Sequence, residues 1–314
     1  MAAHKCTVFS REIVRCGKLS SQGRVSHDPV CFQGLSDMRR PETAAELIQF
    51  LQAMNWLRTS LPRMAQVVDP LRLFLEELMV GAPGQTKGVA KKHAIPRAAW
   101  TEGRLKAWGD AQDLVAHAVT LHHPRPGCQV LVFPGASECH WGSFVTQVPD
   151  AEIDQNLPVD DMTHEPLAFL SGTLKGSQIR WATIDEEEFA IVSTFRRLAH
   201  FLLNGVHMFT GHRNLAYIFD HKACVTSVSK ALAQRLEGCK GVLGQYRYAI
   251  CHNPGDRNAW GDLLSHWMRF PALPVHAVAV FGLWDQDDSM PSKAERSSSA
   301  TESTWDGWHG GAIV

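Results

Sequence analysis

The sequence lacks several patterns that would assign it to familiar functional classes. Its eight cysteines include no C-x-x-C pair, so zinc-ribbon and thiol-redox motifs find no support. No uninterrupted apolar run reaches the roughly 20 residues that span a bilayer, and no basic-then-apolar leader opens the chain. We therefore expect an intracellular protein, cytoplasmic or nuclear and not secreted, with reduced thiols and no membrane partner.

The chain also lacks a strong excess of either charge, because its formal net charge is only −1. The charge is uneven, however: residues 1–121 hold 16 Lys+Arg against 11 Asp+Glu, whereas residues 271–314 hold 2 against 6. A basic first part could contact a phosphate backbone, but so small an excess is also typical of a solvated face. Charge alone leaves nucleic-acid binding open.

Two further functional classes find little support. Ser137 and His140 suggest a nucleophile pair, but no third orienting group or G-x-S-x-G elbow accompanies them, which argues against a serine hydrolase. Ten tryptophans would suit base stacking. Five of them lie in helix-like or strand-like patterns, which favours core packing instead: Trp56, Trp100, Trp108, Trp141 and Trp181.

The first third of the chain changes from short strands to helices. Residues 1–36 predict strands and turns, whereas helical spacing begins at Pro41, with Thr43 and Glu46 as a capping box. Pro62 and Pro70 should divide this stretch into short helices. A loop with a small basic cluster (81–97) precedes another helix from Trp100 to Val119.

The pattern from residue 124 onward predicts a mixed sheet with helices on its faces. A buried strand at 128–133 ends at Pro134 and Gly135, and an acidic insert at 149–163 separates its hairpin partner from the third strand. The further elements follow in the order strand 141–148, strand 165–174, helix 180–203, strand 206–210, helical 213–245, strand 247–252 and helix 258–268. Beyond Leu273 a Ser-, Asp- and Glu-rich composition predicts a flexible tail.

The helix at 180–203 has a marked start and one apolar stripe. Thr183 and Glu186 have the spacing of a capping box. Ile191, Phe195, Leu198 and Leu202 recur at helical spacing and should face the core. Glu187 heads this stripe, whereas its acidic neighbours should point elsewhere. A carboxylate on a buried face needs a metal, a hydrogen-bond donor or water, although a first-turn acid that favours the helix start is an equally simple interpretation.

Five blocks in this order resemble the ribonuclease H domain of gypsy-type LTR retrotransposon polyproteins. They cover about half of the chain and are VFPGAS (132–137), HEPLAFLSGTL (164–174), RWATIDEEEFAIV (180–192), FTGHRNLAYIF (209–219) and HNPGDRNAWGDLLSHW (252–267). Residues 39–71 resemble the thumb of such reverse transcriptases, and the piece around Trp100 resembles their connection region.

The resemblance implies a division of the chain: a thumb-like region (1–81), a connection (82–123), a ribonuclease H-like domain (124–270) and a flexible tail (271–314). The implied fold is α/β, a ribonuclease H-like mixed sheet flanked by helices and preceded by a small, mostly helical region. A polymerase would also need paired aspartates in a Y-x-D-D turn, and nothing in the sequence matches.

The family's chemistry, as the resemblance implies it, uses four carboxylates that hold two divalent metals and cut RNA in an RNA–DNA hybrid. Glu187 and Asp262 match two of these metal ligands. The other two acids belong to T-D-A-S and T-D-H sequences, which correspond here to Pro134–Ser137 and Thr210–His212. Glycine therefore replaces two of four catalytic acids, at Gly135 and Gly211.

Neither loss has an evident substitute in the sequence. Glu138 lies three positions after Gly135, an odd offset that turns it to the opposite face of a strand. We therefore expect weak Mg²⁺ or Mn²⁺ binding and a severely weakened or lost hybrid endonuclease. The alternative is a non-catalytic nucleic-acid-binding remnant of a decayed element. Expected partners are an RNA–DNA hybrid or another nucleic acid, and other polyprotein segments.

Overall fold

The computed structural model of the chain describes residues 10–82, 87–137, 139–155, 157–220 and 239–253. Its first half holds four strands and five helices: β1 (Glu12–Arg15), β2 (Lys18–Ser21), β3 (Arg24–His27), α1 (Pro29–Ser36), α2 (Ala44–Leu57), α3 (Met64–Leu78), α4 (Lys87–Ala90), α5 (Glu102–Ala116) and β4 (Leu121–His122). The second half holds β5 (Cys128–Ala136), β6 (His140–Pro149), α6 (Asp150–Asp154), β7 (Glu165–Thr173), α7 (Thr183–Arg197), α8 (Ala199–Leu202), β8 (Val206–Thr210), α9 (Arg213–Phe219) and β9 (Tyr248–His252).

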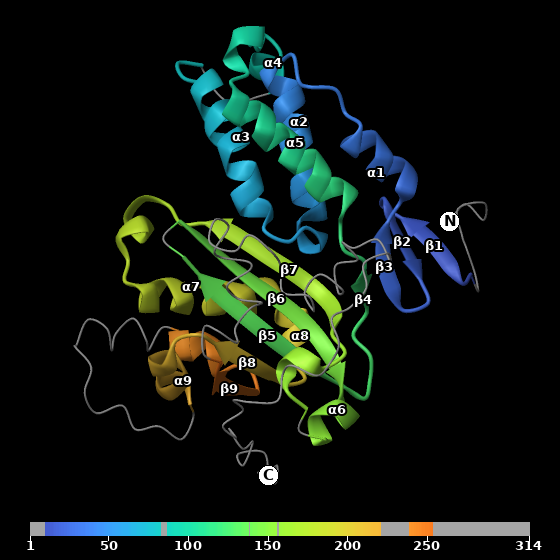
Figure 1. The fold of residues 1–314 in the computed structure, drawn as a ribbon, viewed down its shortest axis with the longest axis vertical. Coiled ribbons are helices and arrows are strands. Elements are labelled where there is room, and N and C mark those ends of the chain that lie inside the picture. Colours follow the sequence, from blue (N-terminus) through green and yellow to red (C-terminus); the bar gives the residue numbers. More distant parts are fainter. Residues whose placement is uncertain (1–9, 83–86, 138, 156, 221–238, 254–314) are drawn as a thin grey trace, which may run out of the picture.

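These elements form three groups, which Figure 1 shows. Helices α1–α5 gather at the top of the view, above a five-stranded sheet, and strands β1–β3 lie at the right. Short 3-10 turns connect them at Arg58–Ser60, Arg97–Ala99, Val159–Asp161 and Gly176–Arg180. No helix in the described ranges is both long and apolar enough to cross a membrane.

Strands β1–β4 form a small antiparallel sheet in that order. Its two hairpin turns, Cys16–Gly17 and Gln22–Gly23, both have positive φ at both central residues, the geometry that suits the right-handed twist of two-residue hairpins. The strands expected within residues 1–36 are thus present, followed by α1. Because β4 pairs with β3, this sheet joins the start of the chain to the segment after α5.

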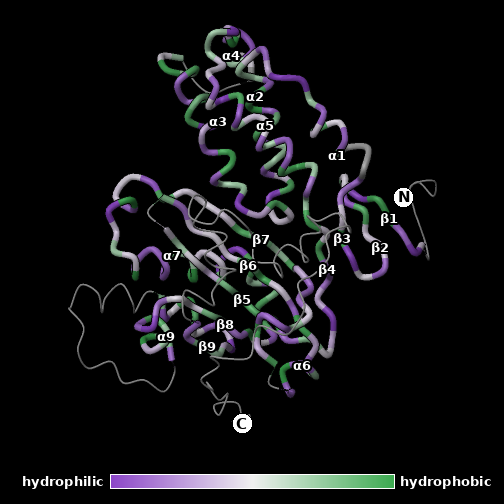
Figure 2. The backbone as a smooth tube through the Cα atoms, viewed as in Figure 1, coloured by the Kyte–Doolittle hydropathy of each residue, from purple (hydrophilic) through white to green (hydrophobic). Residues whose placement is uncertain are grey.

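The helical group has its own apolar core between α2, α3 and α5. Phe50 packs against Trp108 with ring centroids 4.2 Å apart, and Thr43 caps α2 by accepting a hydrogen bond from the Glu46 amide at 3.3 Å. Figure 2 shows hydrophobic and hydrophilic stretches alternating along these helices, as one-sided burial requires.

Two expectations for the helical group are wrong. Pro70 lies inside α3 and does not end it. Burial of the neighbouring residues Val68 and Leu71 stabilises the helix more than the hydrogen bond that proline cannot donate destabilises it. Trp56 is 57% exposed and does not belong to the core, although Trp100 and Trp108 do.

The five-stranded sheet has the order β7-β6-β5-β8-β9. Strands β5, β6 and β7 pair antiparallel, whereas β8 and β9 run parallel to β5. This confirms the expected mixed sheet. One boundary differs: β5 continues through Pro134 and Gly135 to Ala136, since these residues pair with Ser143, Gly142 and Trp141 of β6.

Helix α7 begins and ends differently from the sequence expectation. Its N-cap is Ala182 and no side chain caps it, so the capping box of Thr183 and Glu186 is wrong. The expected single helix is interrupted at Leu198, which leaves α8 as a separate short helix. The stripe itself is confirmed, because Ile191, Phe195, Leu198 and Leu202 are all buried.

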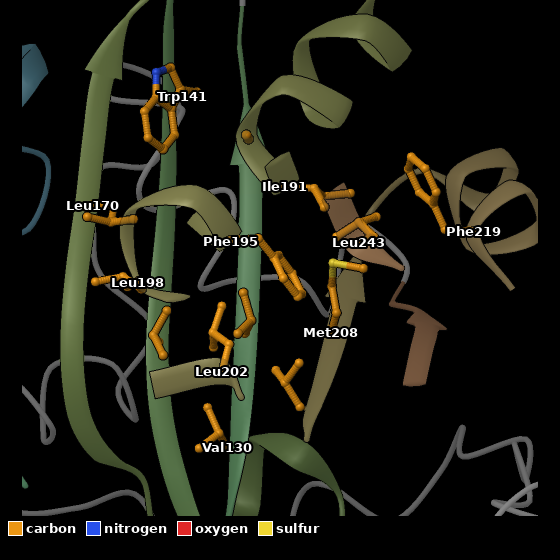
Figure 3. Close-up of a cluster of buried hydrophobic side chains, with 14 of the residues drawn as sticks. Val130, Trp141, Leu170, Ile191, Phe195, Leu198, Leu202, Met208, Phe219 and Leu243 are labelled. Carbon is orange, nitrogen blue, oxygen red and sulfur yellow. The ribbon is translucent and has the colours of Figure 1, made fainter. Parts of the chain in front are cut away.

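This stripe covers one face of the sheet. Figure 3 shows Ile191, Phe195 and Leu202 beside Val130 of β5 and Met208 of β8. The opposite face is closed by a second apolar cluster, in which β5, β6, β7 and β8 contribute Leu131, Phe133, Phe144, Phe169 and Phe209. The sheet is therefore buried on both faces, and this fixes the position of α7.

The helical group docks on the edge strand β7 through the first turns of α3. The Ala65 amide donates to Ser171 Oγ at 2.9 Å, and Thr173 Oγ1 donates to Asp69 Oδ1 at 3.1 Å. Asp69 also lies 3.7 Å from His140 Nε2. The hydrogen bond from His140 and that from Thr173 lower the pKa of Asp69 against the opposing effect of burial.

Several expectations lie outside the described residues. These are the helix at 258–268 with Asp262, the tail at 271–314, Glu138, and most of the helical material expected between 213 and 245. The division at residues 81/82, 123/124 and 270/271 stays a prediction.

Gly172 of β7 generates a test of this packing. A Cβ atom there would lie 2.4 Å from Trp141 Nε1 and 2.7 Å from Cε2, and Trp141 is only 1% exposed. Gly172→Ala should therefore lower the free energy of unfolding by about 1–3 kcal/mol through overpacking, as measured by denaturant unfolding.

The matched control is Gly109→Ala in α5, where a Cβ atom meets nothing within 4 Å. Alanine favours a helix interior over glycine, so this variant should be up to about 1 kcal/mol more stable. Equal stability of the two variants would contradict the packing of Trp141 against β7.

Candidate functional site

The candidate site lies where α7 meets the carboxyl end of β8. Thr210 Oγ1 donates a hydrogen bond to Glu187 Oε2 at 3.0 Å. The same hydroxyl accepts a hydrogen bond from the His212 amide at 3.2 Å. Thr210 is fully buried, so this short chain of hydrogen bonds fixes the Glu187 carboxylate next to Gly211. Glu187 is therefore hydrogen-bonded to the residue that precedes Gly211, and its role as a site residue stays a prediction.

Strand register favours a position of Gly135 near Gly211. The parallel pairing of β5 and β8 runs to Val132 opposite Met208, and continuing it for three positions brings Gly135 level with Gly211. Alternation puts both glycines in phase with Phe133 and Phe209 on one face of the sheet, whereas Glu187 approaches from the α7 side. Carboxylates at both glycine positions would thus be neighbours at adjacent strand ends.

The backbone does not require glycine at either position. Positive φ occurs at six other glycines among the described residues: Gly17, Gly23, Gly81, Gly127, Gly176 and Gly205. Gly135 and Gly211 do not share this conformation, which L side chains avoid. An aspartate is therefore compatible with the local backbone at both positions.

The acids beside Glu187 are more buried than expected. Glu186 and Glu188 are each only 5% exposed, although their sequence positions put them off the apolar stripe that Glu187 heads. Cys239 lies next to Glu188, and burial together with that carboxylate raises the pKa of its thiol to about 12. Cys239 is accordingly a neutral thiol rather than a nucleophile.

Two histidines lie at the same end of the sheet. His252 Nε2 donates to the Gly211 carbonyl at 3.2 Å, and His212 precedes α9 as its N-cap residue. Burial lowers the pKa of His212, and the charge of His252 lowers it further. The His252 ring thus ties the end of β9 to Gly211, and His212 starts α9 at the end of β8.

The Ser137–His140 pair is a turn. The Ser137 amide donates to the His140 carbonyl at 2.7 Å, and the His140 amide donates to the Ser137 carbonyl at 3.2 Å. The His140 ring is directed to Asp69 of α3. This arrangement stabilises the β5–β6 hairpin and offers no nucleophile–base pair.

The described residues do not fit a metal cage of the kind the family uses. No group of three or more His, Cys, Asp and Glu side chains within them is placed to hold a metal ion. Glu187 is a candidate ligand in this part of the chain, and Gly135 and Gly211 offer no side-chain oxygen. Asp262 and Glu138 lie outside the described residues.

Comparison with known proteins agrees with this fold. Residues 126–238 match the sequence profile of the RNase H-like domain found in reverse transcriptase. The transposon Tf2-3 and Tf2-4 polyproteins of Schizosaccharomyces pombe are each 24% identical over 230 residues, which covers 72% of this chain and 15% of the relative. The chain thus spans about 15% of the length of these curated relatives.

Solved structures show the same fold. The foamy viral protease-reverse transcriptase in complex with dsDNA aligns with a TM-score of 0.57 at 14% identity, over 80% of this chain and 47% of that one. Its complex with an RNA/DNA hybrid aligns with a TM-score of 0.57 at 12% identity, over 80% of this chain and 30% of that one.

The sheet order and the sequence match define a ribonuclease H-like domain of the reverse-transcriptase type. The chain is a relative of retrotransposon polyproteins, as the five sequence blocks predicted. The matches do not distinguish the gypsy type, which stays a prediction. Ribonuclease H-like domains generally depend on divalent metals.

Sequence reasoning named Glu187 and the two glycines as site residues but missed Thr210, the hydrogen-bond partner of Glu187. A signal existed: Thr210 immediately precedes Gly211 in the T-G-H sequence and is the last residue of β8. Threonine at such a position often bonds locally to backbone or carboxylate groups.

Thr210→Val tests the link between α7 and β8. The substitution preserves shape but removes the donor to Glu187 and the acceptor for His212, so it should lower the free energy of unfolding by about 1–3 kcal/mol. Chemical denaturation measures the change.

Thr194→Val in α7 is the matched control. Thr194 is also fully buried, but its hydroxyl donates to the Ala190 carbonyl, which the helix ladder satisfies anyway, so its loss should be smaller. Equal losses in the two variants would mean that the Thr210 bonds do not hold the site together.

Proposed function

We propose that this chain is a ribonuclease H-like nucleic-acid-binding protein whose cleavage of RNA in RNA–DNA hybrids is severely weakened or lost. The observation that carries this proposal is glycine at positions 135 and 211, where the sequence resemblance expects two of the four acids, with Glu187 retained. The family match supports the substrate class. Reverse transcriptases of the same fold have been solved with dsDNA and with an RNA/DNA hybrid, which supports a nucleic-acid partner.

The charge balance at the strand ends favours this interpretation over an active enzyme. Magnesium requires near-octahedral oxygen coordination, supplied by one or two carboxylates together with water and substrate phosphates. Glu187 and Asp262 leave room for one loosely held ion, whereas a pair of ions in register needs the acids that Gly135 and Gly211 replace. Even a thousandfold loss of rate corresponds to about 4 kcal/mol of barrier.

The hydrogen bonds around Glu187 stabilise its carboxylate without a metal ion. Thr210 donates to Glu187 and receives the His212 amide, so the carboxylate that would otherwise repel other acids is hydrogen-bonded within the protein. When bound, a divalent cation would supply water activation and charge neutralisation. In this chain Glu187 would supply one carboxylate oxygen to that cation, and Asp262 is the candidate for a second carboxylate ligand.

A hybrid-cleavage assay with Mg²⁺ or Mn²⁺ tests the proposal. We expect the wild-type chain to cleave no faster than Glu187→Gln, which serves as the blank. The Gly135→Asp/Gly211→Asp double variant should cleave at least about a thousandfold faster than wild type. Robust wild-type cleavage that Glu187→Gln abolishes would overturn the proposal.

Thermal unfolding with and without Mg²⁺ is a second test. Without metal the double variant should be less stable than wild type, because two added carboxylates at adjacent strand ends repel each other. It should also gain more stability from Mg²⁺, because the ion binds only the folded site. An equal response to the ion in both proteins would count against a metal site at these positions.

The alternative is a non-catalytic binding protein that has kept the fold. It shares the expectation of no cleavage, but it also requires hybrid affinity that falls steeply with salt, because released counterions drive such binding. The observation in its favour is a group of basic side chains where the helical group meets the ribonuclease H-like domain. Other polyprotein segments are proposed as further partners.

A further inference from the structure

Two cavities lie end to end along the edge strand β7, between the helical group and α7. One has a volume of about 630 Å³ and the other about 470 Å³. Arg58, Leu170 and Arg197 line both. The cavities together follow β7 from Leu167 to Thr173, a path of about 20 Å at about 3.3 Å per strand residue, and reach Lys175 just beyond the strand. We refer to the two cavities together as the β7 trough.

Six cationic side chains line the β7 trough. Four line the first cavity and four the second, with two in common: Arg15, Lys18, Arg58, Arg72, Lys175 and Arg197. No aspartate or glutamate is among the described residues that line either cavity. Asp69 is near Arg72, but its carboxylate already accepts a hydrogen bond from Thr173 and faces His140.

Arg58 and Arg197 are the centre of the trough. Arg58 begins the 3-10 turn after α2, and Arg197 ends α7, so the two guanidinium groups come from opposite sides of the boundary between the two groups. Partial burial lowers the pKa of Arg197, and the nearby charge of Arg58 lowers it further. The guanidinium of Arg197 also lies over the Trp141 ring, 4.8 Å from its centroid, which holds it in place.

Two like charges held together need a counter-charge. Within the described part of the chain neither Arg58 nor Arg197 forms an ion pair with a carboxylate, although Arg39, Arg104 and Arg125 do. Guanidinium groups bind phosphate oxygens in bidentate fashion. A phosphate group between the two arginines would relieve their repulsion.

We propose that the β7 trough is a phosphate-binding site centred on Arg58 and Arg197. Its ligand is a phosphate-bearing chain, either the backbone of a single nucleic-acid strand or a free oligophosphate. Both cavities have volumes within the about 300–1,000 Å³ typical of small-ligand sites, and the extended path along β7 suits a linear ligand. The site is separate from Glu187 and does not depend on the proposed nuclease chemistry.

The test uses the full chain in magnesium-free buffer. Inorganic pyrophosphate is titrated at constant ionic strength and binding is measured by calorimetry. A fluorescently labelled oligothymidylate is titrated in parallel and binding is measured by anisotropy. The variants are Arg58→Gln and Arg197→Lys, with Arg97→Gln as the charge-matched control, because Arg97 is exposed and lies outside both cavities.

We expect pyrophosphate to bind wild type and Arg97→Gln alike, and at least tenfold more weakly to Arg58→Gln. Arg197→Lys keeps the charge but loses the bidentate geometry, so its affinity should be intermediate. If the affinity for the oligonucleotide falls in the same variants and the oligonucleotide competes with pyrophosphate, the ligand is a nucleic-acid strand. If only pyrophosphate binding changes, the ligand is a free oligophosphate.

Three results would overturn the proposal. One is no binding of either probe to the wild-type chain. Another is equal affinity of Arg58→Gln and Arg97→Gln for both probes. The third uses Glu187→Gln in the same assays: a loss of probe affinity as large as in Arg58→Gln would assign phosphate binding to the strand-end site. These assays measure binding without metal, whereas the proposed loss of cleavage is tested by the cleavage rate with metal, so failure here leaves that proposed loss intact.

Discussion

The packing of α7 against the five-stranded sheet is the constraint on which the rest of the domain depends. Ile191 and Phe195 press on β5 and β8 from one face, and the aromatic cluster around Phe133 and Phe209 closes the other. A helix held this firmly cannot slide or rotate, so the position of every residue in its first turns is set. Glu187 reaches Thr210 for that reason, and the strand ends meet a carboxylate there.

Much of this arrangement was predictable because it rests on strong, local patterns. Strand β8 was predicted to the residue, since alternating apolar residues are bounded by Gly205 and Gly211. The stripe of α7 followed from helical spacing. The boundaries predicted at Pro134 and Pro70 are wrong, because pairing with β6 keeps Pro134 in the strand and packing of α3 keeps Pro70 in the helix. The break at Leu198 has no comparable sequence signal.

The candidate site was predictable only in part. The two glycines stood out because ordered blocks of sequence flanked them, whereas the Thr210 hydroxyl became significant only when α7 and β8 were brought together. Likewise, Arg58 and Arg197 are 139 positions apart in the sequence. No periodicity links them, so their proximity is a product of the docked helical group. Long-range electrostatic pairs of this kind require a structure.

The contacts between α3 and β7 carry a consequence for how this chain can be divided. A strand at the margin of a sheet exposes unpaired amide and carbonyl groups that invite a second chain to add itself. Here the edge strand β7 is flanked by the 3-10 turn Arg58–Ser60, α3 and β4. Hydrogen bonds of α3 with Ser171 and Thr173 hold the helical group against β7. The helical group is thus a protective flank for its neighbour. Separating the helical group from the five-stranded sheet would expose the edge of β7, and the exposed edge would favour self-association over a monomer.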